Sequence, residues 1–549
     1  MKINKNGILL LALVVATIFM GIGYSAINSI TGDIKGKATA NNQDGVFITD
    51  VEYVSDIDAN LNNSKIENFL GTMMKSTVKL SESNTKSEIK YKVTIYNNAI
   101  EAAVFEKVTY GKEFYDNEGI IYEIEGFTPG QTIGSKETKE IIITFKYKDQ
   151  TTVPANKILN SYLNFEMIVP NRMVLAKSVT ETGKYLTGSI LKNQIESVKF
   201  KKGEEPTSTD ILAKFDASEK QDESIIGYYT DTDNNGLYEL TFISNKTIFP
   251  NKSAQYLFSN LNNVQSFEFD NFSTIGTTSF LGMFQGCNKI TALDLNNWDV
   301  SKVTEFGHSG WSYGGTFEYC TNLKELNIEN WNTESAKDIS NMFSFNGSLT
   351  KLNVNNLNTS SVTAMYAVFL GCNNLTELDL SKWNTSKVTT MDAMFGNCNS
   401  LTNLDLSNWN TENLKSVVNM FQYCFNLVSV KLDNLKTDKI TNLQGMFHSC
   451  RSLTEINLSG FDTKSVTNTV AMFQQCTNLK TIYVKEYDST NNTGWTTSAV
   501  TNSTNMFLNC GNIVGGNGTK FDTTYKDATY ARIDTAGTPG YLTNINNKN

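Results

Sequence analysis

The stretch that decides the fold is Met394-Phe-Gly-Asn-Cys-Asn-Ser-Leu-Thr-Asn-Leu-Asp-Leu-Ser-Asn-Trp-Asn-Thr411, because the chain repeats variants of it ten times. One phenylalanine anchors each copy, at Phe258, Phe284, Phe317, Phe343, Phe369, Phe395, Phe421, Phe447, Phe473 and Phe507. Seven of the nine steps between these anchors are 26 residues, and the other two are 33 and 34 residues. A fixed period in the twenties with an L-x-x-L-x-L core is typical of a leucine-rich-repeat solenoid.

Each repeat predicts a short strand, a corner and helical turns. Leu404 and Leu406 alternate with polar neighbours, which indicates a strand with one buried face. Five further apolar side chains fall at helical spacing and predict one or two helical turns, namely Val388, Met391, Met394, Phe395 and Cys398. Because one coil cannot bury its own apolar edge, neighbouring coils must stack. The sequence therefore predicts a leucine-rich-repeat α/β solenoid of ten coils over residues 256–512.

The chain before the repeats begins with a predicted export segment, residues 1–40. Lys2 and Lys5 precede an uncharged stretch from Gly7 to Asn28. A basic start followed by an apolar run is typical of a secretory signal. The length of this run lies between that of a cleaved signal peptide and that of a membrane helix, which needs about 20 apolar residues. We therefore expect a signal peptide or a helical signal anchor, followed by an exported chain.

Residues 41–170 follow a period of two. Five stretches are rich in Ile, Val, Tyr and Phe, namely Gly45–Val54, Glu88–Tyr96, Gly119–Glu125, Lys139–Tyr147 and Ser161–Val169. Several such strands without helical stretches predict an all-β sandwich of the immunoglobulin-like kind. The expected role of this domain is a spacer between the cell surface and the repeats, and a binding function of its own is the alternative.

The segments that flank the repeats are predicted to be caps. A solenoid needs an atypical first unit to cover its open apolar end, and residues 171–255 are placed to supply a linker and this N-terminal cap. Residues 513–549 begin with a glycine-rich run and are predicted to form the C-terminal cap and tail.

One loop of the N-terminal cap segment allows two interpretations. Asp231, Asp233 and Asn235 place oxygen side chains at alternate positions, as a calcium loop does. However, Phe242 stands where such a loop has its bidentate glutamate. Asn235-Gly236 between two strand-like runs instead favours a β-hairpin. Apart from calcium at this loop, no cofactor is predicted.

All eight cysteines stand three residues after an anchor phenylalanine, at Cys287, Cys320, Cys372, Cys398, Cys424, Cys450, Cys476 and Cys510. Asn346 fills the same position in the fourth repeat. A position that accepts asparagine indicates a small buried site, in which a free thiol packs well. Disulfides between neighbouring coils are the alternative, because stacking would place the Cα atoms about 5 Å apart. A metal site would need several thiolates around one point, which a linear row does not provide.

Charge and motifs exclude several function classes. The chain holds 47 basic and 56 acidic residues without a cluster of Lys and Arg, so no nucleic-acid partner is predicted. It has two histidines, His308 and His448, and no nucleophile elbow, phosphate loop or metal-spaced set of His and Cys. No enzymatic activity is therefore predicted. A carboxylate pair for glycoside hydrolysis is the catalytic alternative that the sequence leaves open.

The candidate ligand-contact residues lie in two places. On the strands, the residues that alternate with the buried leucines form an exposed sheet face, the usual binding face of a solenoid. The candidates there are Asp294, Glu325, Asn327, Glu377, Asp379, Asn403, Asp405, Glu455 and Asn457. In the insertion Gly307–Gly315, Trp311 and Tyr313 are candidates, because insertions in solenoids often form binding loops. The alternatives are a solubilising surface and a solvent-tolerant loop.

The repeats, of which residues 394–411 are one, resemble the BspA-like leucine-rich-repeat surface proteins of bacteria. Residues 195–200 and 530–534 resemble the flanks of that family, and the likeness covers residues 190–543. The resemblance implies a cell-surface or secreted protein that adheres to host matrix proteins or to other microbes. In contrast to many members, no wall-sorting tail follows the repeats. Residues 23–28, Gly-Tyr-Ser-Ala-Ile-Asn, resemble exported proteins of Gram-positive bacteria.

The sequence thus predicts an exported surface protein that acts as a non-enzymatic adhesin. It is expected to bind host matrix or cell-surface proteins through the sheet face and the inserted loops. The alternative is a structural component of the envelope or biofilm that binds itself, other bacteria or wall glycans. In both cases the protein is expected at the cell surface, held in the membrane by residues 1–40 or secreted after their cleavage.

Overall fold

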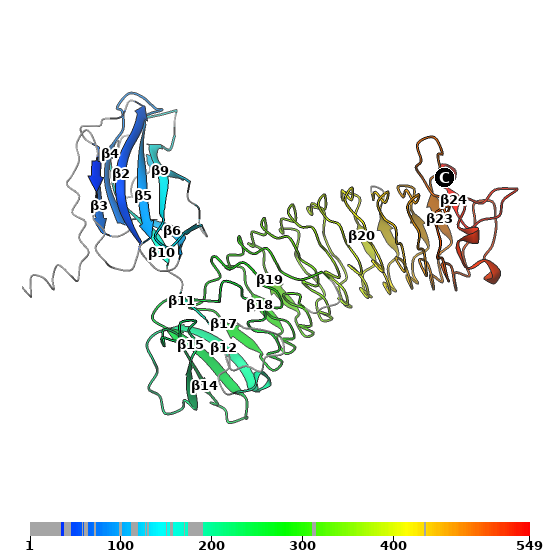
Figure 1. The fold of residues 1–549 in the computed structure, drawn as a ribbon, viewed down its shortest axis with the longest axis horizontal. Coiled ribbons are helices and arrows are strands. Elements are labelled where there is room, and N and C mark those ends of the chain that lie inside the picture. The colour runs from blue at the N-terminus through cyan, green and yellow to red at the C-terminus, as the bar shows by residue number, and fades with distance from the viewer. Residues whose placement is uncertain are drawn as a thin grey trace, which may run out of the picture. The chain divides into compact units, whose positions relative to one another are not determined.

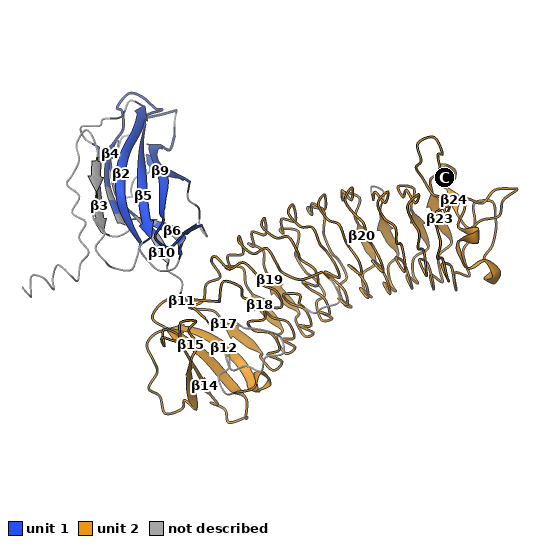
Figure 2. Cartoon of the chain, viewed as in Figure 1, with its two compact units in different colours: residues 1–170 blue, residues 171–549 orange. Residues whose placement is uncertain are grey.

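The computed structural model divides the chain into two compact units, Met1–Pro170 and Asn171–Asn549 (Figures 1 and 2). The structure describes residues 35–37, 46–57, 59, 64–70, 73–97, 102–110, 119–126, 128, 131–149, 151–153, 158–168, 171–173, 190–309, 314–432 and 435–548. The stretch from Gly7 to Asn28, for which a signal helix is predicted, lies outside these residues. Within the ranges just given, no helix is long and apolar enough to cross a membrane.

The first unit consists of two antiparallel sheets of five strands each. One sheet has the order β1 (Lys35–Lys37), β2 (Val46–Ile57), β5 (Glu88–Asn97), β9 (Thr138–Tyr147) and β7 (Ile120–Glu125). The other has the order β3 (Lys65–Leu70), β4 (Met73–Lys79), β10 (Ile158–Ile168), β6 (Ala103–Tyr110) and β8 (Thr132–Ile133). Burial alternates along β5, so that Tyr91 and Val93 enter an apolar core shared with Leu163 and Phe165 of β10. Alternate β-branched and aromatic residues suit such a half-buried pleated surface.

The second unit begins with a mixed sheet that caps the repeats. Its order is β13 (Ala213–Asp216), β14 (Ile226–Thr230), β15 (Tyr238–Ser244), β12 (Ile195–Lys202) and β17 (Ser266–Glu268). A separate parallel pair joins β11 (Asn171–Arg172) to β16 (Ile248–Phe249). Phe200 of β12 stacks on Phe242 with 5.0 Å between ring centroids, and it lies 6.0 Å from the first anchor ring, Phe258. The cap therefore buries the apolar end of the first repeat.

Successive repeats lie side by side as coils of one stack (Figure 1). The described strands pair in parallel, β18 (Ala292–Asp294) with β19 (Glu325–Asn327), β20 (Asn403–Asp405) with β21 (Ser429–Lys431), and β22 (Glu455–Asn457) with β23 (Thr481–Val484). A second row of parallel bridges runs in turn through Ser253, Ser279, Glu305, Asp338, Ala364, Thr390 and Ser416. Backbone hydrogen bonds thus tie each coil to the next along two sides.

Rows of equivalent side chains fill the interior of the stack. The anchor rings from Phe284 to Phe507 stack on one another with centroids 5.5 to 5.9 Å apart. All eight cysteines are buried and free. Each thiol donates to the carbonyl of the anchor phenylalanine one coil earlier, as Cys398 Sγ does to Phe369 O at 3.2 Å. Burial raises the pKa of Cys372 to about 12, so this thiol stays protonated.

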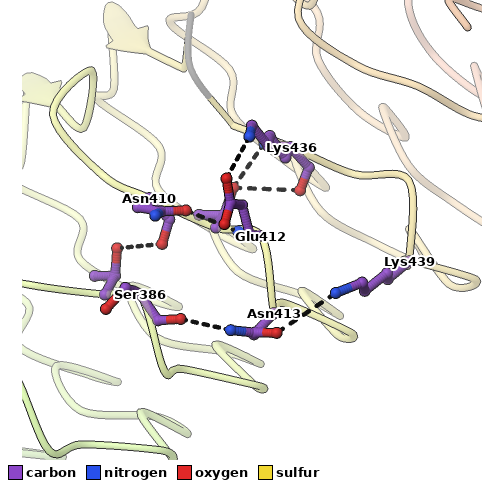
Figure 3. A network of polar contacts seen from close by, with 8 residues as sticks. Ser386, Asn410, Glu412, Asn413, Lys436 and Lys439 are labelled. Carbon is purple, nitrogen blue, oxygen red and sulfur yellow. Dashed lines mark hydrogen bonds and ion pairs between the residues drawn. The ribbon is translucent and has the colours of Figure 1, made fainter.

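Polar side chains join the coils at the Trp-Asn-Thr corner (Figure 3). Thr411 Oγ1 accepts a hydrogen bond from the N–H of Lys436 at 2.6 Å and donates to the carbonyl of the same residue at 3.2 Å. Lys436 also pairs with Glu412 at 2.6 Å, and Asn413 Nδ2 donates to Ser386 O at 2.7 Å. Because these groups come from three successive coils, they hold one corner above the next.

The prediction of a leucine-rich-repeat α/β solenoid is wrong, because the described part of the chain contains no α-helix. Its helical elements are four 3₁₀ helices, η2 (Lys192–Gln194), η3 (Thr523–Tyr525), η4 (Ala528–Tyr530) and η5 (Ile545–Asn547), and all four lie outside the repeats. Tight turns occupy the segment of each repeat for which helical turns are predicted.

Left-handed residues explain why these segments are not helical. Ala393 and Asn397, two residues before and after the anchor Phe395, have φ values of 54° and 59°, which an α-helix does not accommodate. The N–H groups of these three residues donate to carbonyls of the next coil at 2.7–2.9 Å. The N–H groups of Gly396 and Cys398 instead close i to i+3 turns, at 3.0 and 3.1 Å. Apolar residues three and four apart occur both in a helix and in this run of turns, so periodicity alone does not separate the two.

The last coil is covered by the C-terminal segment. β24 (Thr543–Asn544) pairs in parallel with β23, and the ring of Tyr541 lies 5.3 Å from that of Phe507, the last anchor. The buried carboxylate of Asp534 accepts hydrogen bonds from the N–H groups of Asn517, Thr519 and Gly540 at 2.8, 2.9 and 3.2 Å. This carboxylate fixes the glycine-rich turn against the end of the stack.

Candidate functional site

The outward-pointing residues of the short strands form one exposed surface, which we call the strand face. In β20 the first and third residues, Asn403 and Asp405, are exposed, while Leu404 between them is 3% exposed. The same alternation repeats in β18 and β21, and in β22 the first residue is exposed and the third is half-buried. Because the repeat places equivalent residues side by side, the strand face carries rows of polar groups with the spacing of a parallel sheet.

An open groove of about 790 Å³ crosses the strand face over three successive coils. Residues from 376–381, 402–408 and 429–431 line it. Four of the predicted contact residues, Glu377, Asp379, Asn403 and Asp405, come together there. The groove also contains Thr376, Leu378, Thr402 and Ser429, which are not among the predicted contact residues. Their repeat positions could have identified them, because each residue lies beside a predicted contact residue in its own coil or in the next one.

Ion pairs position two of the acidic groups of the groove. Lys431 Nζ lies 2.7 Å from Asp405 Oδ2, and Lys351 Nζ lies 2.8 Å from Glu377 Oε1. Ser407 donates to Asp405 through its N–H at 3.0 Å and through its hydroxyl at 2.6 Å. The pair with Lys431, together with these donors, lowers the pKa of Asp405 to about 2. Asp405 is therefore an anion at every physiological pH.

Hydrogen bonds fix the two remaining predicted groups of the groove. Asp379 accepts from the N–H of Ser381 at 2.9 Å and from Asn355 Nδ2, one coil away, at 2.7 Å. The N–H donor lowers the pKa of Asp379. Asn403 Oδ1 accepts from the hydroxyl of Ser429 at 2.7 Å. The groove thus presents oriented oxygen atoms on a frame whose coils are tied together.

The other predicted residues of the strand face lie on coils outside the groove. Asp294, Glu325 and Glu455 are exposed, while Asn327 and Asn457 are half-buried. Lys548 from the C-terminal segment lies 3.5 Å from Glu455. Trp311 and Tyr313, the two candidates in the insertion, lie outside the described residues.

The base of the insertion is held by two carboxylates. Asp338 Oδ2 accepts from the N–H of Ser309 at 3.1 Å on one side. On the other side, Glu318 Oε2 accepts from the N–H groups of Gly314 and Gly315 at 2.7 and 3.2 Å. Burial raises the pKa of Glu318 and of Asp338. Both carboxylates therefore hold the two ends of the insertion in place through backbone hydrogen bonds.

The loop considered as a calcium site forms the turn of a β-hairpin in this structure. Asp231, Asp233 and Asn235 belong to the connection between the antiparallel strands β14 and β15. Asp231 accepts from the N–H of Asn235 at 3.0 Å and from that of Gly236 at 3.2 Å. The oxygen atoms that a calcium ion would need thus cap the turn. Elsewhere among the described residues no group of three His, Cys, Asp or Glu is placed to hold a metal ion.

A family model described as "Mycoplasma protein of unknown function, DUF285" matches residues 252–309, 311–429 and 419–533. These ranges make up just over half of the chain and contain the strand face with its groove. No curated protein matches the chain.

Proposed function

This chain belongs to the DUF285 family, and we propose that it is an exported surface protein that binds protein ligands without catalysing a reaction. The family match falls on the repeats that resemble BspA-like surface proteins, and this agreement supports the proposal. The ligands are host matrix or cell-surface proteins, and the contact surface is the strand face.

The groove on the strand face is the observation that carries this proposal. Asp379 and Asp405 are exposed, ionised and fixed by donors from their own and neighbouring coils. Carboxylates outnumber lysines on the strand face, although Lys431 and Lys351 pair with Asp405 and Glu377 there. A rigid, extended array with an excess of acidic groups favours ligands that present basic groups over a similar length. We therefore expect the ligand to contribute a segment rich in lysine or arginine.

Buried carboxylates of the repeats support a non-enzymatic protein. Burial raises the pKa of Glu318, Asp338 and Asp392, as it does in general acids. However, each of them accepts hydrogen bonds from backbone N–H groups, such as that of Val418 to Asp392 Oδ1 at 2.8 Å. These bonds give each carboxylate a structural role, and those of Asp338 and Asp392 join neighbouring coils.

The test is binding of the purified full-length chain to a panel of matrix proteins, host cells, wall fractions and the chain itself, measured by surface plasmon resonance. Asp379→Asn and Asp405→Asn should each weaken saturable binding to a host protein about tenfold. Glu334→Gln removes one charge from an exposed corner residue and should leave binding unchanged. Saturable binding that neither aspartate variant weakens would refute the strand face as the contact surface. Binding only to wall fractions or to the chain itself would assign the protein to the envelope-component alternative.

A further inference from the structure

The repeats carry a second surface, the turn face, formed by the segments that run from two residues before to four residues after each anchor phenylalanine. Its ten segments contain no lysine and no aspartate, and their single glutamate is the buried Glu318. The only other charged or imidazole side chains of the turn face are His448 and Arg451. The turn face is thus free of exposed carboxylates, in contrast to the acidic strand face, although the whole chain has a formal charge of −9.

His448 and Arg451 belong to one cluster that spans two coils. The guanidinium carbon of Arg451 lies 4.6 Å from the centre of the Phe425 ring. The ring of Tyr423 lies 5.9 Å from that of Phe425 and 5.0 Å from that of His448. The turns bring these four side chains together, because Phe425 and Arg451 occupy the same position in successive repeats.

The cluster is accessible and keeps hydrogen-bonding capacity. Tyr423, Phe425 and His448 are half-buried, and Arg451 is exposed. Arg451 Nη2 donates to Gln475 Oε1 at 3.4 Å, a long bond to a single acceptor. A guanidinium carries five N–H donors in a planar fork that matches a carboxylate, and it stacks on aromatic rings as it does here. Arg451 therefore combines a contact with an aromatic ring and an exposed guanidinium with five N–H donors.

Arg451 is also unusual within the chain. Only three of the 47 basic residues are arginines, and the other two, Arg172 and Arg532, donate to the carbonyls of Pro250 and Pro539. Arg451 is the one arginine within the ten repeats. A lysine at this position would lack the planar fork.

We propose that Tyr423, Phe425, His448 and Arg451 form a binding site for a sugar that carries a carboxylate. The fork of Arg451 binds the carboxylate, and the half-buried rings of Tyr423 and Phe425 lie against the C–H groups of the sugar ring. His448, whose Nδ1 lies 3.4 Å from Gln422 Nε2, flanks Tyr423 at the edge of the site. The absence of carboxylates from the surrounding turn segments removes the repulsion that an acidic sugar would meet on the strand face. The site is separate from the groove and does not depend on the function proposed above.

The experiment uses the full-length chain and a polymer of glucuronate and N-acetylglucosamine, immobilised for biolayer interferometry. Neutral dextran and poly-glutamate of similar length serve as competitors. The wild-type chain should bind the glucuronate polymer, dextran should not compete, and poly-glutamate should compete at least tenfold less well than the free polymer. Arg451→Gln and Phe425→Leu should each weaken binding about tenfold. Arg451→Lys, which keeps the charge and loses the fork, should weaken it several-fold.

Lys415→Gln is the matched control, because it removes an exposed positive charge from the same repeats outside the turn face. This variant should bind as the wild type does, and thermal unfolding should show that every variant is folded. Equal binding by Arg451→Gln and the wild type would overturn the proposal. Equal competition by poly-glutamate would overturn the sugar as the ligand and point to an acidic peptide. No binding of the polymer by a folded wild-type chain would also overturn it.

Discussion

At the scale of single residues, buried polar groups hold the coils in register. Thr411 is 1% exposed, and its hydroxyl both accepts from and donates to the backbone of Lys436 in the next coil. Thr359 and Thr437 make the same pair of bonds to the backbone of Asn384 and Asp462, each in the next coil. A buried N–H or carbonyl left without its partner costs about 1–3 kcal/mol.

Thr411→Val removes this hydroxyl and keeps the shape of the side chain. We expect it to lower the free energy of unfolding by about 1–3 kcal/mol, because the N–H of Lys436 loses its acceptor. Urea unfolding followed by circular dichroism measures the change. The control is Thr454→Val, at an exposed threonine two coils further on, which should stay within about 0.5 kcal/mol of the wild type. Equal effects of the two substitutions would contradict the role of the buried hydroxyl.

Glu318 gives a prediction about pH. Burial raises its pKa in the folded chain above the unfolded value near 4.5, so between these two values the folded chain binds more protons than the unfolded chain. The contribution of Glu318 to the free energy of unfolding therefore increases as the pH falls from neutral towards 4.5. Glu318→Gln removes the titration and retains an oxygen that accepts from Gly314 and Gly315. Relative to the wild type, the variant should be most stable at pH 7 and lose this advantage on acidification, and a constant difference across pH would contradict the assignment.

At the scale of the element, the repeat is a run of turns whose alternate N–H groups pair with the next coil. The left-handed positions before and after each anchor suit glycine and asparagine, which occupy several of them. Where alanine stands instead, as at Ala393, the left-handed conformation costs about 1–2 kcal/mol.

Substitutions at Ala393 test this conformation. Ala393→Gly should be close to neutral, since relief of the left-handed strain offsets the larger entropy of the unfolded chain. Ala393→Val should destabilise by more than about 1 kcal/mol, because a β-branched residue is a genuine outlier at positive φ. A helical segment would rank the two in the opposite order, with glycine the more harmful. Thermal unfolding of both variants decides between the turn and the helix.

The strand face could be predicted from the sequence, and the turns could not. Alternation in Leu404-Asp405-Leu406 identifies the buried and the exposed side of a strand without any knowledge of its neighbours. By contrast, the apolar spacing around Phe395 suits a helix equally well, and only the bonds to the next coil exclude it. The groove was also missed, because it arises from three coils together and no single repeat contains it.

At the scale of the whole molecule, the eight thiols form a buried row without cross-links. We expect a thiol reagent to label none of them in the folded chain and all eight after unfolding in denaturant without reductant. A reductant should leave the unfolding temperature unchanged, because no disulfide stabilises the stack. Fewer than eight reactive thiols in the unfolded chain would contradict free cysteines.

The strand face carries exposed carboxylates and the turn face has none, and this contrast leads to the most direct test. The affinity of a host protein captured from the panel should be measured against salt concentration, for the wild-type chain and for the double variant Asp379→Asn, Asp405→Asn. If the strand face binds a basic segment, the affinity of the wild type falls steeply with salt, whereas that of the variant is lower and much less sensitive to salt. Parallel salt dependence and equal affinity of the two chains would show that the ligand binds elsewhere.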